Sequence, residues 1–430
     1  MKLSVIGSGY VGTTIAACFA ELGHDAVNVD IDEAVVNSIN DGRAPIHEPG
    51  LEALLEKHGG KSLTATTDYD DLLETDITFL ALPTPSKEDG SIDTSIIEAA
   101  AETLGDTLRE KAGDHVAVTK STVIPTTTTE TLAPILADTS GKQLGEDLHV
   151  AMNPEFLREG TAVEDFQNPD KVVFGSDSET AINTLQEIFE PLTKASNATV
   201  VETGVEEAEM IKYANNAFLA SKVSLINDIG NICKEFGVDA YEVADAIGLD
   251  NRIGERFLRS GLGWGGSCFG KDTNAIIHAA KETGYEPAML DAAVAVNDRQ
   301  PERLLSLLDD HIDVESERVA VLGLAFKPGT DDVRDSRAIP VINGLQERGV
   351  NVAAYDPVAA ENMRTHFPDI EYTDAPQDAL AGASACVVCT DWDEFAVLDE
   401  EFDAMETRVV VDGRRIIERR DGLTYEGLTW

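Results

Sequence analysis

A glycine-rich turn near the N-terminus constrains the fold more than any other part of the chain. Residues 7–12 (GSGYVG) lie between residues 2–6, expected to form a buried strand, and the helical pattern of residues 13–22. A second apolar strand, residues 26–29, follows and ends at Asp30. This order of strand, glycine turn, helix, strand and acidic residue is that of a dinucleotide-binding βαβ unit. The sequence therefore predicts a Rossmann-like fold at the N-terminus.

The same turn predicts the cofactor. Its glycines allow a tight bend and let a pyrophosphate approach the free N–H groups at the start of a helix. The carboxylate of Asp30 can accept hydrogen bonds from ribose hydroxyls and would repel a 2′-phosphate, so NAD is favoured over NADP. The residues expected to contact NAD from this unit are Gly7, Gly9, Tyr10, Val11, Gly12 and Asp30.

Strands and helices continue to alternate beyond this unit. Further strands are expected at residues 77–82, 115–119, 148–152 and 171–174. This alternation predicts a doubly wound parallel sheet, in which ligands lie beyond the carboxyl ends of the strands. Polar residues stand at three such ends: Thr84, Thr122 after Ser121, and Glu155 after Asn153. Each alone is more often part of a capped turn, but together they can line up a cofactor and a substrate.

The middle and the end of the chain complete the expected architecture. Residues 205–236 read as one long helix without proline, of the kind that bridges domains or builds a dimer interface. A second α/β unit follows, with strands at residues 319–323 and 350–355 but no full glycine fingerprint. The fold class predicted is α/β, with two Rossmann-like doubly wound domains joined by a long central helix. The expected domains are an NAD-binding domain (1–203), a central helical domain (204–314) and a C-terminal α/β domain (315–430).

The charge of the chain excludes several classes of partner. With 33 basic and 79 acidic residues the formal net charge is −46, so a nucleic acid or an anionic membrane would be repelled. The acidic residues are spread along the chain, and the regular apolar segments argue against a disordered acidic protein. We expect a globular protein adapted to a salt-rich cytoplasm, where dissolved ions shorten the range over which the acidic side chains repel one another. No signal peptide and no membrane-spanning run are apparent, so a cytoplasmic location is expected.

Cysteine placement argues against disulfides and metal sites. The five cysteines are too few and too scattered for a disulfide framework. Cys386 and Cys389 have the spacing of a metal or redox motif, but they lie in an apolar run expected to be a strand. Strand alternation would point these two thiols to opposite faces, which favours plain packing. No metal site is expected.

Cys268 has different surroundings. Residues 261–272 (GLGWGGSCFGKD) place five glycines around it and end in Lys271 and Asp272, between helices expected at residues 239–247 and 273–283. A lone cysteine in a loop is more often an incidental buried thiol. Here the glycines permit close approach of a ligand, and the lysine can help to hold a thiolate. The segment therefore favours a nucleophile.

These motifs resemble those of the nucleotide-sugar 6-dehydrogenases, and most closely the members that oxidise UDP-glucose. The cysteine loop is similar to the family's active-site loop, residues 155–160 (EFLREG) to its substrate-binding motif, and residues 210–216 (MIKYANN) to its second catalytic motif. The resemblance extends from residue 1 to about residue 412, with the motifs in the family's order.

The resemblance implies roles for individual residues. The catalytic residues would be Cys268, Lys212, Asn216, Asp272, Glu155 and Thr122. Further contacts to NAD would come from Thr84, Thr122, Lys271 and Arg334. The substrate would be bound by Glu155, Phe156, Leu157, Arg158, Glu159, Lys212, Asn216, Arg252, Phe257, Leu258, Gly261, Gly265 and Lys327. The resemblance also implies a homodimer or higher homo-oligomer in which Arg252 reaches the substrate of the other subunit.

The implied reaction is the NAD-dependent four-electron oxidation of UDP-glucose to UDP-glucuronate, a sugar acid for glycan or glycoprotein synthesis. A thiolate suits it, because attack on the intermediate aldehyde gives a thiohemiacetal that can be oxidised to a thioester and hydrolysed. Lys212 and Asn216 would stabilise the developing oxyanions, and Asp272 would be the base. The sequence leaves the division of acid and base roles among Asp272, Lys212 and Glu155 open. Glu155 and Thr122 would position a water. Two alternatives stay open: oxidation of GDP-mannose or a UDP-N-acetylhexosamine, and a binding or regulatory protein without catalysis, against which the intact cysteine loop argues.

Overall fold

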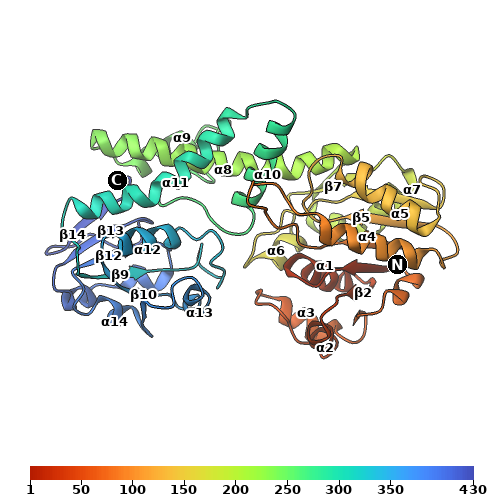
Figure 1. Ribbon diagram of the computed structural model, residues 1–430, viewed down its shortest axis with the longest axis horizontal. Coiled ribbons are helices and arrows are strands. Elements are labelled where there is room, and N and C mark those ends of the chain that lie inside the picture. Colours follow the sequence, from red (N-terminus) through yellow and green to blue (C-terminus); the bar gives the residue numbers. More distant parts are fainter. The chain divides into compact units, whose positions relative to one another are not determined.

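The computed structural model describes all 430 residues, and they form two compact units, Met1–Asn215 and Asn216–Trp430. Each unit contains one sheet with helices packed on it (Figure 1). The α/β class predicted from the sequence is confirmed. The finer division into three functional domains stays a prediction.

The first unit is built on an eight-stranded sheet of order β3-β2-β1-β4-β5-β6-β7-β8. Its strands are β1 (Lys2–Ile6), β2 (Asp25–Val29), β3 (Leu63–Thr66), β4 (Ile77–Leu80), β5 (His115–Thr119), β6 (Leu148–Met152), β7 (Lys171–Gly175) and β8 (Thr199–Thr203). The pairing β3-β2-β1-β4 places the glycine turn after β1, beside the end of β4. This is the arrangement in which doubly wound sheets bind ligands.

The sheet departs from a fully parallel arrangement at one place. β6 and β7 run antiparallel and touch at a single pair of residues, Met152 and Gly175, whereas the other neighbouring strands are parallel. The edge strands β3 and β8 were also not predicted. Both are short, and β8 is largely exposed, so neither carries the apolar run by which a buried strand is recognised.

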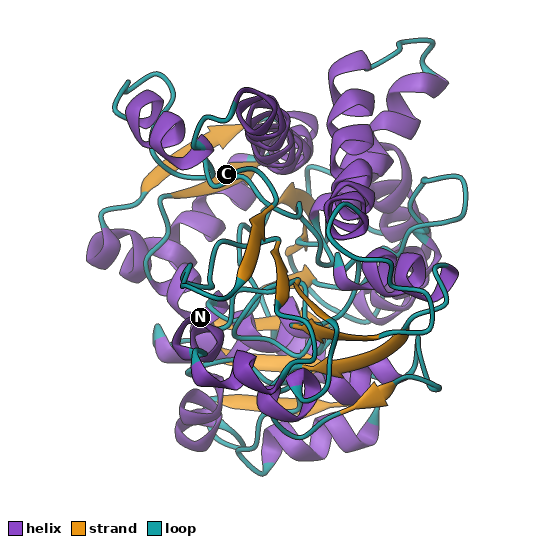
Figure 2. Ribbon diagram, turned by 90° about the vertical axis from the view of Figure 1, so that its left-hand side faces the viewer, coloured by secondary structure: helices purple, strands orange, loops and turns teal.

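Helices cover both faces of this sheet (Figure 2). They are α1 (Tyr10–Glu21), α2 (Glu33–Asn40), α3 (Leu51–His58), α4 (Ser95–Leu108), α5 (Ala133–Ser140), α6 (Ala162–Gln167) and α7 (Glu179–Ser196). Phe19 of α1 anchors the core on one face. Its ring lies 5.0 Å from that of Phe79 on β4 and meets Phe166 and Phe189 edge-on at 5.5 and 5.4 Å. This packing fixes α1, and with it the glycine turn, against the sheet.

The second unit contains a six-stranded parallel sheet of order β11-β10-β9-β12-β13-β14. The strands are β9 (Arg318–Leu322), β10 (Asn351–Tyr355), β11 (Glu371–Tyr372), β12 (Ala385–Val388), β13 (Val409–Asp412) and β14 (Thr424–Gly427). Its helices are α9 (Ala240–Gly248), α10 (Phe269–Glu282), α11 (Ala288–Asp309), α12 (Ala338–Glu347), α13 (Ala360–Arg364) and α14 (Pro376–Leu380). Cys386 and Cys389 pack into different apolar clusters, as the alternation predicted.

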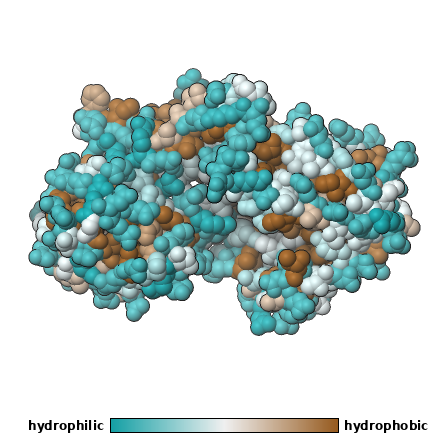
Figure 3. Space-filling model, in the orientation of Figure 1, coloured by the Kyte–Doolittle hydropathy of each residue, from teal (hydrophilic) through white to brown (hydrophobic).

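The long helix predicted from the sequence is α8 (Val205–Phe236), 32 residues that run from the first unit into the second. Five large apolar side chains on it are exposed: Met210 (42%), Phe218 (71%), Leu225 (58%), Ile232 (52%) and Phe236 (79%). Apolar atoms are visible on the surface near its C-terminal end, at the upper left of Figure 3. No helix of the protein has the length and apolar character needed to cross a membrane.

Candidate active site

The glycine turn of the first unit has the geometry that a dinucleotide needs. Gly7 has a φ of +100°, and a Cβ on Gly12 would lie 1.9 Å from the carbonyl oxygen of Gly7. A side chain is therefore excluded at Gly12, whereas open space surrounds Gly9. Asp30 accepts a hydrogen bond from the backbone N–H of Ser8 at 2.7 Å, so its carboxylate lies directly at the turn. These residues fit a pyrophosphate and a ribose.

The ends of β4 and β5 bring two predicted residues together. The hydroxyl of Thr84 donates to the carbonyl oxygen of Thr122 at 2.8 Å. Ser121 joins the same two strand ends, because its hydroxyl donates to the Leu82 carbonyl at 2.7 Å and accepts from the Leu82 N–H at 2.8 Å. The polar residues predicted at these strand ends therefore form one connected group.

Glu155, after β6, and Lys212, on α8, form a buried ion pair. The Lys212 Nζ lies 2.7 Å from the Glu155 carboxylate and also donates to the Glu155 carbonyl at 2.8 Å. Burial opposes ionisation of Glu155, but the attraction of Lys212, its hydrogen bond and the Leu157 N–H outweigh it, so the pKa of Glu155 is lowered. The carboxylate is consequently charged at neutral pH.

Lys120 is a buried lysine near the predicted residues Glu155 and Lys212 that the sequence did not single out. It directly follows β5, is buried, and its Nζ donates to the Asn153 Oδ1 at 2.8 Å. Burial lowers the pKa of Lys120 to about 7, although the charge of Glu155 works in the opposite direction. The signal that could have revealed it is a lysine directly before Ser121 at a strand end where apolar residues are expected.

The predicted substrate segment, residues 155–160, is held by side chains of the first unit. The ammonium of Lys171 lies 4.0 Å from the ring centroid of Phe156. Leu157 packs against the apolar core, and the Arg158 guanidinium pairs with Asp165 of α6 at 2.6 Å. Glu159 is half-buried.

The cysteine loop lies in the second unit, and Cys268 is the residue that caps the N-terminus of α10. The helix begins at Phe269, earlier than expected, so its N-terminal N–H groups and dipole lie next to the thiol. Cys268 is half-buried, whereas the other four cysteines are buried. A helix N-terminus favours the thiolate form of a partly accessible cysteine.

Asp272 lies one turn further along α10 and is almost fully buried. Its carboxylate accepts hydrogen bonds from the Asn216 amide at 2.7 Å and from the Lys271 ammonium at 2.6 Å. Three predicted residues therefore form one cluster. Lys271 pairs with its neighbour Asp272 in this structure, although the sequence suggested a role at the thiolate or at the cofactor.

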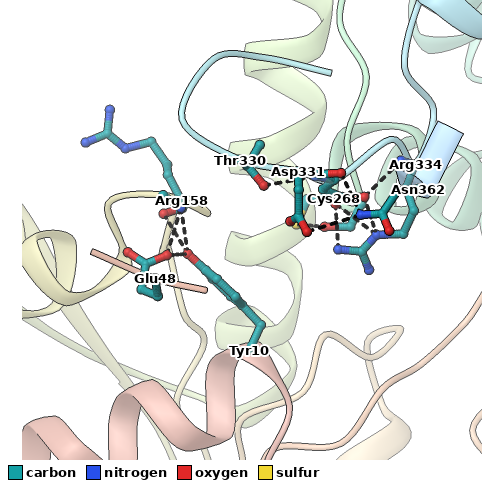
Figure 4. A network of polar contacts seen from close by, with 11 residues as sticks. Tyr10, Glu48, Arg158, Cys268, Thr330, Asp331, Arg334 and Asn362 are labelled. Carbon is teal, nitrogen blue, oxygen red and sulfur yellow. Dashed lines mark hydrogen bonds and ion pairs between the residues drawn. The ribbon is translucent and has the colours of Figure 1, made fainter. Parts of the chain in front are cut away.

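The cysteine loop packs closely against residues 326–335. A Cβ on Gly265 would lie 2.2 Å from the carbonyl oxygen of Asp335, and the N–H of Gly266 donates to the carbonyl of Arg334 at 2.9 Å. The Arg334 guanidinium pairs with Asp332 at 2.6 Å. Figure 4 shows Cys268 drawn together with Thr330, Asp331, Arg334 and Asn362 of this part of the unit.

The remaining predicted substrate residues have varied surroundings. Lys327 is half-buried, with its ammonium 5.5 Å from the ring centroid of Phe326. Arg252 pairs with Asp250 at 2.6 Å, and its side chain is 89% exposed. Leu258 is buried, Phe257 is exposed with a φ of +63°, and the N–H of Gly261 donates to Asn227 at 2.9 Å.

Comparison with known proteins agrees with these observations along the chain. Family models of the UDP-glucose/GDP-mannose dehydrogenase family match the NAD binding domain at residues 1–193, the central domain at 206–299 and the UDP binding domain at 320–419.

Relatives match over the full length. The UDP-glucose 6-dehydrogenase AglM of Haloferax volcanii is 64% identical, and the match covers 100% of both chains. The solved UDP-glucose dehydrogenase of Pyrobaculum islandicum is 41% identical, with a TM-score of 0.93 over 100% of this chain and 98% of that one. The UDP-glucose 6-dehydrogenase TuaD of Bacillus subtilis is 41% identical, over 96% and 89% of the two chains. The chain therefore belongs to the UDP-glucose/GDP-mannose dehydrogenase family, and it is an oxidoreductase that uses NAD as its cofactor.

Proposed function

We propose that the enzyme oxidises UDP-glucose to UDP-glucuronate in two successive NAD-dependent steps. The observation that carries this proposal is the placement of Cys268, a partly accessible thiol at the N-terminus of a 14-residue helix. The relatives named as UDP-glucose dehydrogenases support the choice of sugar nucleotide, and the match to a UDP binding domain supports its uridine part. The product would serve as a sugar acid for glycan or glycoprotein synthesis.

The chemistry balances as follows. The C6 alcohol loses a hydride and a proton to give an aldehyde, and the Cys268 thiolate adds to that aldehyde, with uptake of one proton, to form a thiohemiacetal. Loss of a second hydride and a proton gives a thioester, and water then cleaves the carbon–sulfur bond to release the carboxylate and the thiolate. One alcohol and one water are thus converted into a carboxylate, two hydrides and three protons. The glycine turn and Asp30 would hold NAD, which would supply the hydride acceptor for each oxidation.

The residues of the two units would divide the remaining tasks. Lys212 and Asn216 would stabilise the negative charge that develops on the substrate oxygen. Asp272 would take up the proton of the alcohol, and its carboxylate is held by the Asn216 amide at 2.7 Å. Glu155 and Thr122 would position the hydrolytic water. Lys327 would bind the substrate.

The test is NADH formation with purified enzyme and four candidate substrates: UDP-glucose, GDP-mannose, UDP-N-acetylglucosamine and UDP-N-acetylmannosamine. We expect turnover with UDP-glucose and two NADH for every UDP-glucuronate. Preferential turnover of GDP-mannose or of a UDP-N-acetylhexosamine would assign that nucleotide sugar as the substrate instead of UDP-glucose. Binding of a nucleotide sugar without NADH formation would support the non-catalytic alternative.

Asp30 should determine the choice between NAD and NADP. Because a carboxylate at the turn repels a 2′-phosphate, the parent enzyme should strongly prefer NAD. Asp30→Ala should raise the KM for NAD and relax the discrimination. Asp30→Asn is the matched control, since an amide oxygen can still accept the Ser8 N–H, which donates at 2.7 Å in the parent. If charge is the cause, Asn should also relax the discrimination, by about 10-fold or more. Comparable kcat/KM values with NADP in the parent would refute this assignment.

We further propose a homodimer, or a higher oligomer built from dimers, in which Arg252 contacts the substrate of the partner. The exposed apolar side chains of α8 support an interface, and the 89% exposed side chain of Arg252 is available to another subunit. Arg252→Ala should weaken UDP-glucose binding by about 10-fold or more and leave NAD binding nearly unchanged. Arg259→Ala, which removes another exposed arginine, is the control. A fully active monomer by light scattering, or unaltered affinity for UDP-glucose, would contradict the proposal.

A further inference from the structure

Glu48 is a buried carboxylate with an unusual set of partners. It lies between α2 and α3 and is only 5% exposed. One oxygen accepts the N–H of Ala162 at 2.7 Å; the other accepts the N–H of Gly160 at 2.8 Å and the hydroxyl of Tyr10. All three donors are neutral groups. Because a buried carboxylate is costly unless it is fully hydrogen-bonded, this side chain depends on these donors and constrains them in return.

Tyr10 completes the network, as Figure 4 shows. Its hydroxyl also accepts the N–H of Gly160 at 2.9 Å and lies 3.3 Å from the carbonyl oxygen of Arg158. Burial and the neighbouring Glu48 raise the pKa of Tyr10, so the phenol stays protonated at neutral pH. It therefore remains able to donate to the Glu48 carboxylate.

The network connects two segments that are far apart in the sequence. Tyr10 is the first residue of α1 and lies within the glycine motif of residues 7–12, and Gly160 ends the segment 155–160. Gly160 has a φ of +80°, and the N–H of Arg158 is held by Asp165 at 2.8 Å. The turn at residues 158–162 is thus held by α6 on one side and by Glu48 and Tyr10 on the other.

We propose that Glu48 and Tyr10 are positioning residues that fasten the segment 155–160 to the first turn of α1 and so align the nucleotide sugar with the cofactor. The inference rests on the proposed function in one respect, namely that the segment 155–160 binds the nucleotide sugar. Glu48 acts through the turn and does not touch the reacting atoms. Its carboxylate fixes the position of the backbone at Gly160 and Ala162, where the segment joins α6.

The test uses two conservative variants of the full-length enzyme. Tyr10→Phe keeps the ring and removes only the hydroxyl, and Glu48→Gln keeps the size and removes the charge. For Tyr10→Phe, the KM for the nucleotide sugar that the parent oxidises should rise about 10-fold, because a hydrogen bond to a charged group is lost. In Glu48→Gln the Kd for NAD measured without sugar should change by less than about twofold, because Glu48 is not among the residues expected to contact NAD. Glu48→Gln should have the larger effect, because an amide cannot accept all three donors.

The control is Tyr372→Phe, which also removes one tyrosine hydroxyl, bonded to the Phe367 carbonyl at 3.0 Å. It should leave both constants unchanged. Equal changes in the constants for sugar and NAD, or changes no larger than those of the control, would overturn the proposal. If Glu48→Gln does not fold, Tyr10→Phe decides through its KM for the sugar, compared with Tyr372→Phe, and through amide exchange at Gly160 and Ala162.

A second readout does not depend on the reaction. Amide hydrogen exchange should become faster at Gly160 and Ala162 in Tyr10→Phe but not in Tyr372→Phe. If the parent oxidises no nucleotide sugar, the proposed function fails. The exchange result still tests whether Glu48 and Tyr10 fasten the segment 155–160, an arrangement called the clamp below. Unchanged exchange at both amides would overturn the clamp whatever the substrate is.

Discussion

Cys268→Ser should abolish the formation of UDP-glucuronate, with kcat falling by about 10³-fold or more. A serine hydroxyl at the N-terminus of α10 is not ionised at neutral pH, so it cannot replace the thiolate in forming the acyl intermediate. The measurement is the yield of UDP-glucuronate by chromatography, together with NADH in single-turnover experiments. At most one NADH per site without any carboxylate is compatible with this role, because the nucleophile acts after the first oxidation.

The matched control is Cys233→Ser, which makes the same replacement at a buried thiol on α8. It should lower stability more than turnover. Undiminished UDP-glucuronate production by Cys268→Ser would refute the covalent mechanism, whatever the behaviour of the control.

Removal of salt should unfold and inactivate the enzyme, and return to molar KCl should restore it. The net charge of −46 creates strong self-repulsion, which salt screens as the Debye length shrinks from about 30 Å at 0.01 M to about 3 Å at 1 M. Because acidic side chains outnumber basic ones, some arginines each pair with two carboxylates. Arg348 is shared by Glu302 and Asp309, and Arg420 by Asp399 and Asp403.

The measurement is circular dichroism, thermal unfolding and NADH formation across a KCl series. Sucrose at matched osmolality is the control, since it stabilises compact states without screening charge. Recovery in KCl but not in sucrose is expected. An unaltered Tm and full activity in dilute buffer would contradict the role of screening.

Local patterns predicted the glycine turn, Asp30 and the cysteine loop, because each is contained in a short segment with a known physical requirement. Glu48 could not be found in this way. The backbone donors that it binds are 112 and 114 residues away, so only the folded chain brings them together. The start of α10 also depends on contacts between distant residues: the sequence predicted a helix from residue 273, whereas α10 begins at Phe269. Glycine at position 270 disfavours a helix locally, but a Cβ there would lie 2.4 Å from the Asp335 Oδ2, so the packing of the first turn requires a residue without a side chain.

The single-pair contact between β6 and β7 has a consequence for how the molecule can change. Two strands that meet only at Met152 and Gly175 have little backbone cohesion, and the side chain of Asn153 spans this seam by donating to the Val173 carbonyl at 2.8 Å. The oxygen of the same amide accepts the ammonium of Lys120. A shift of β7 relative to β6 would therefore also displace the buried Lys120 side chain near Glu155. Ser176 also spans the seam, because its hydroxyl donates to the Val150 carbonyl at 2.6 Å. The Asn153 amide is the group that links the cohesion of the sheet to the surroundings of Glu155, so a substitution of Asn153 should alter both.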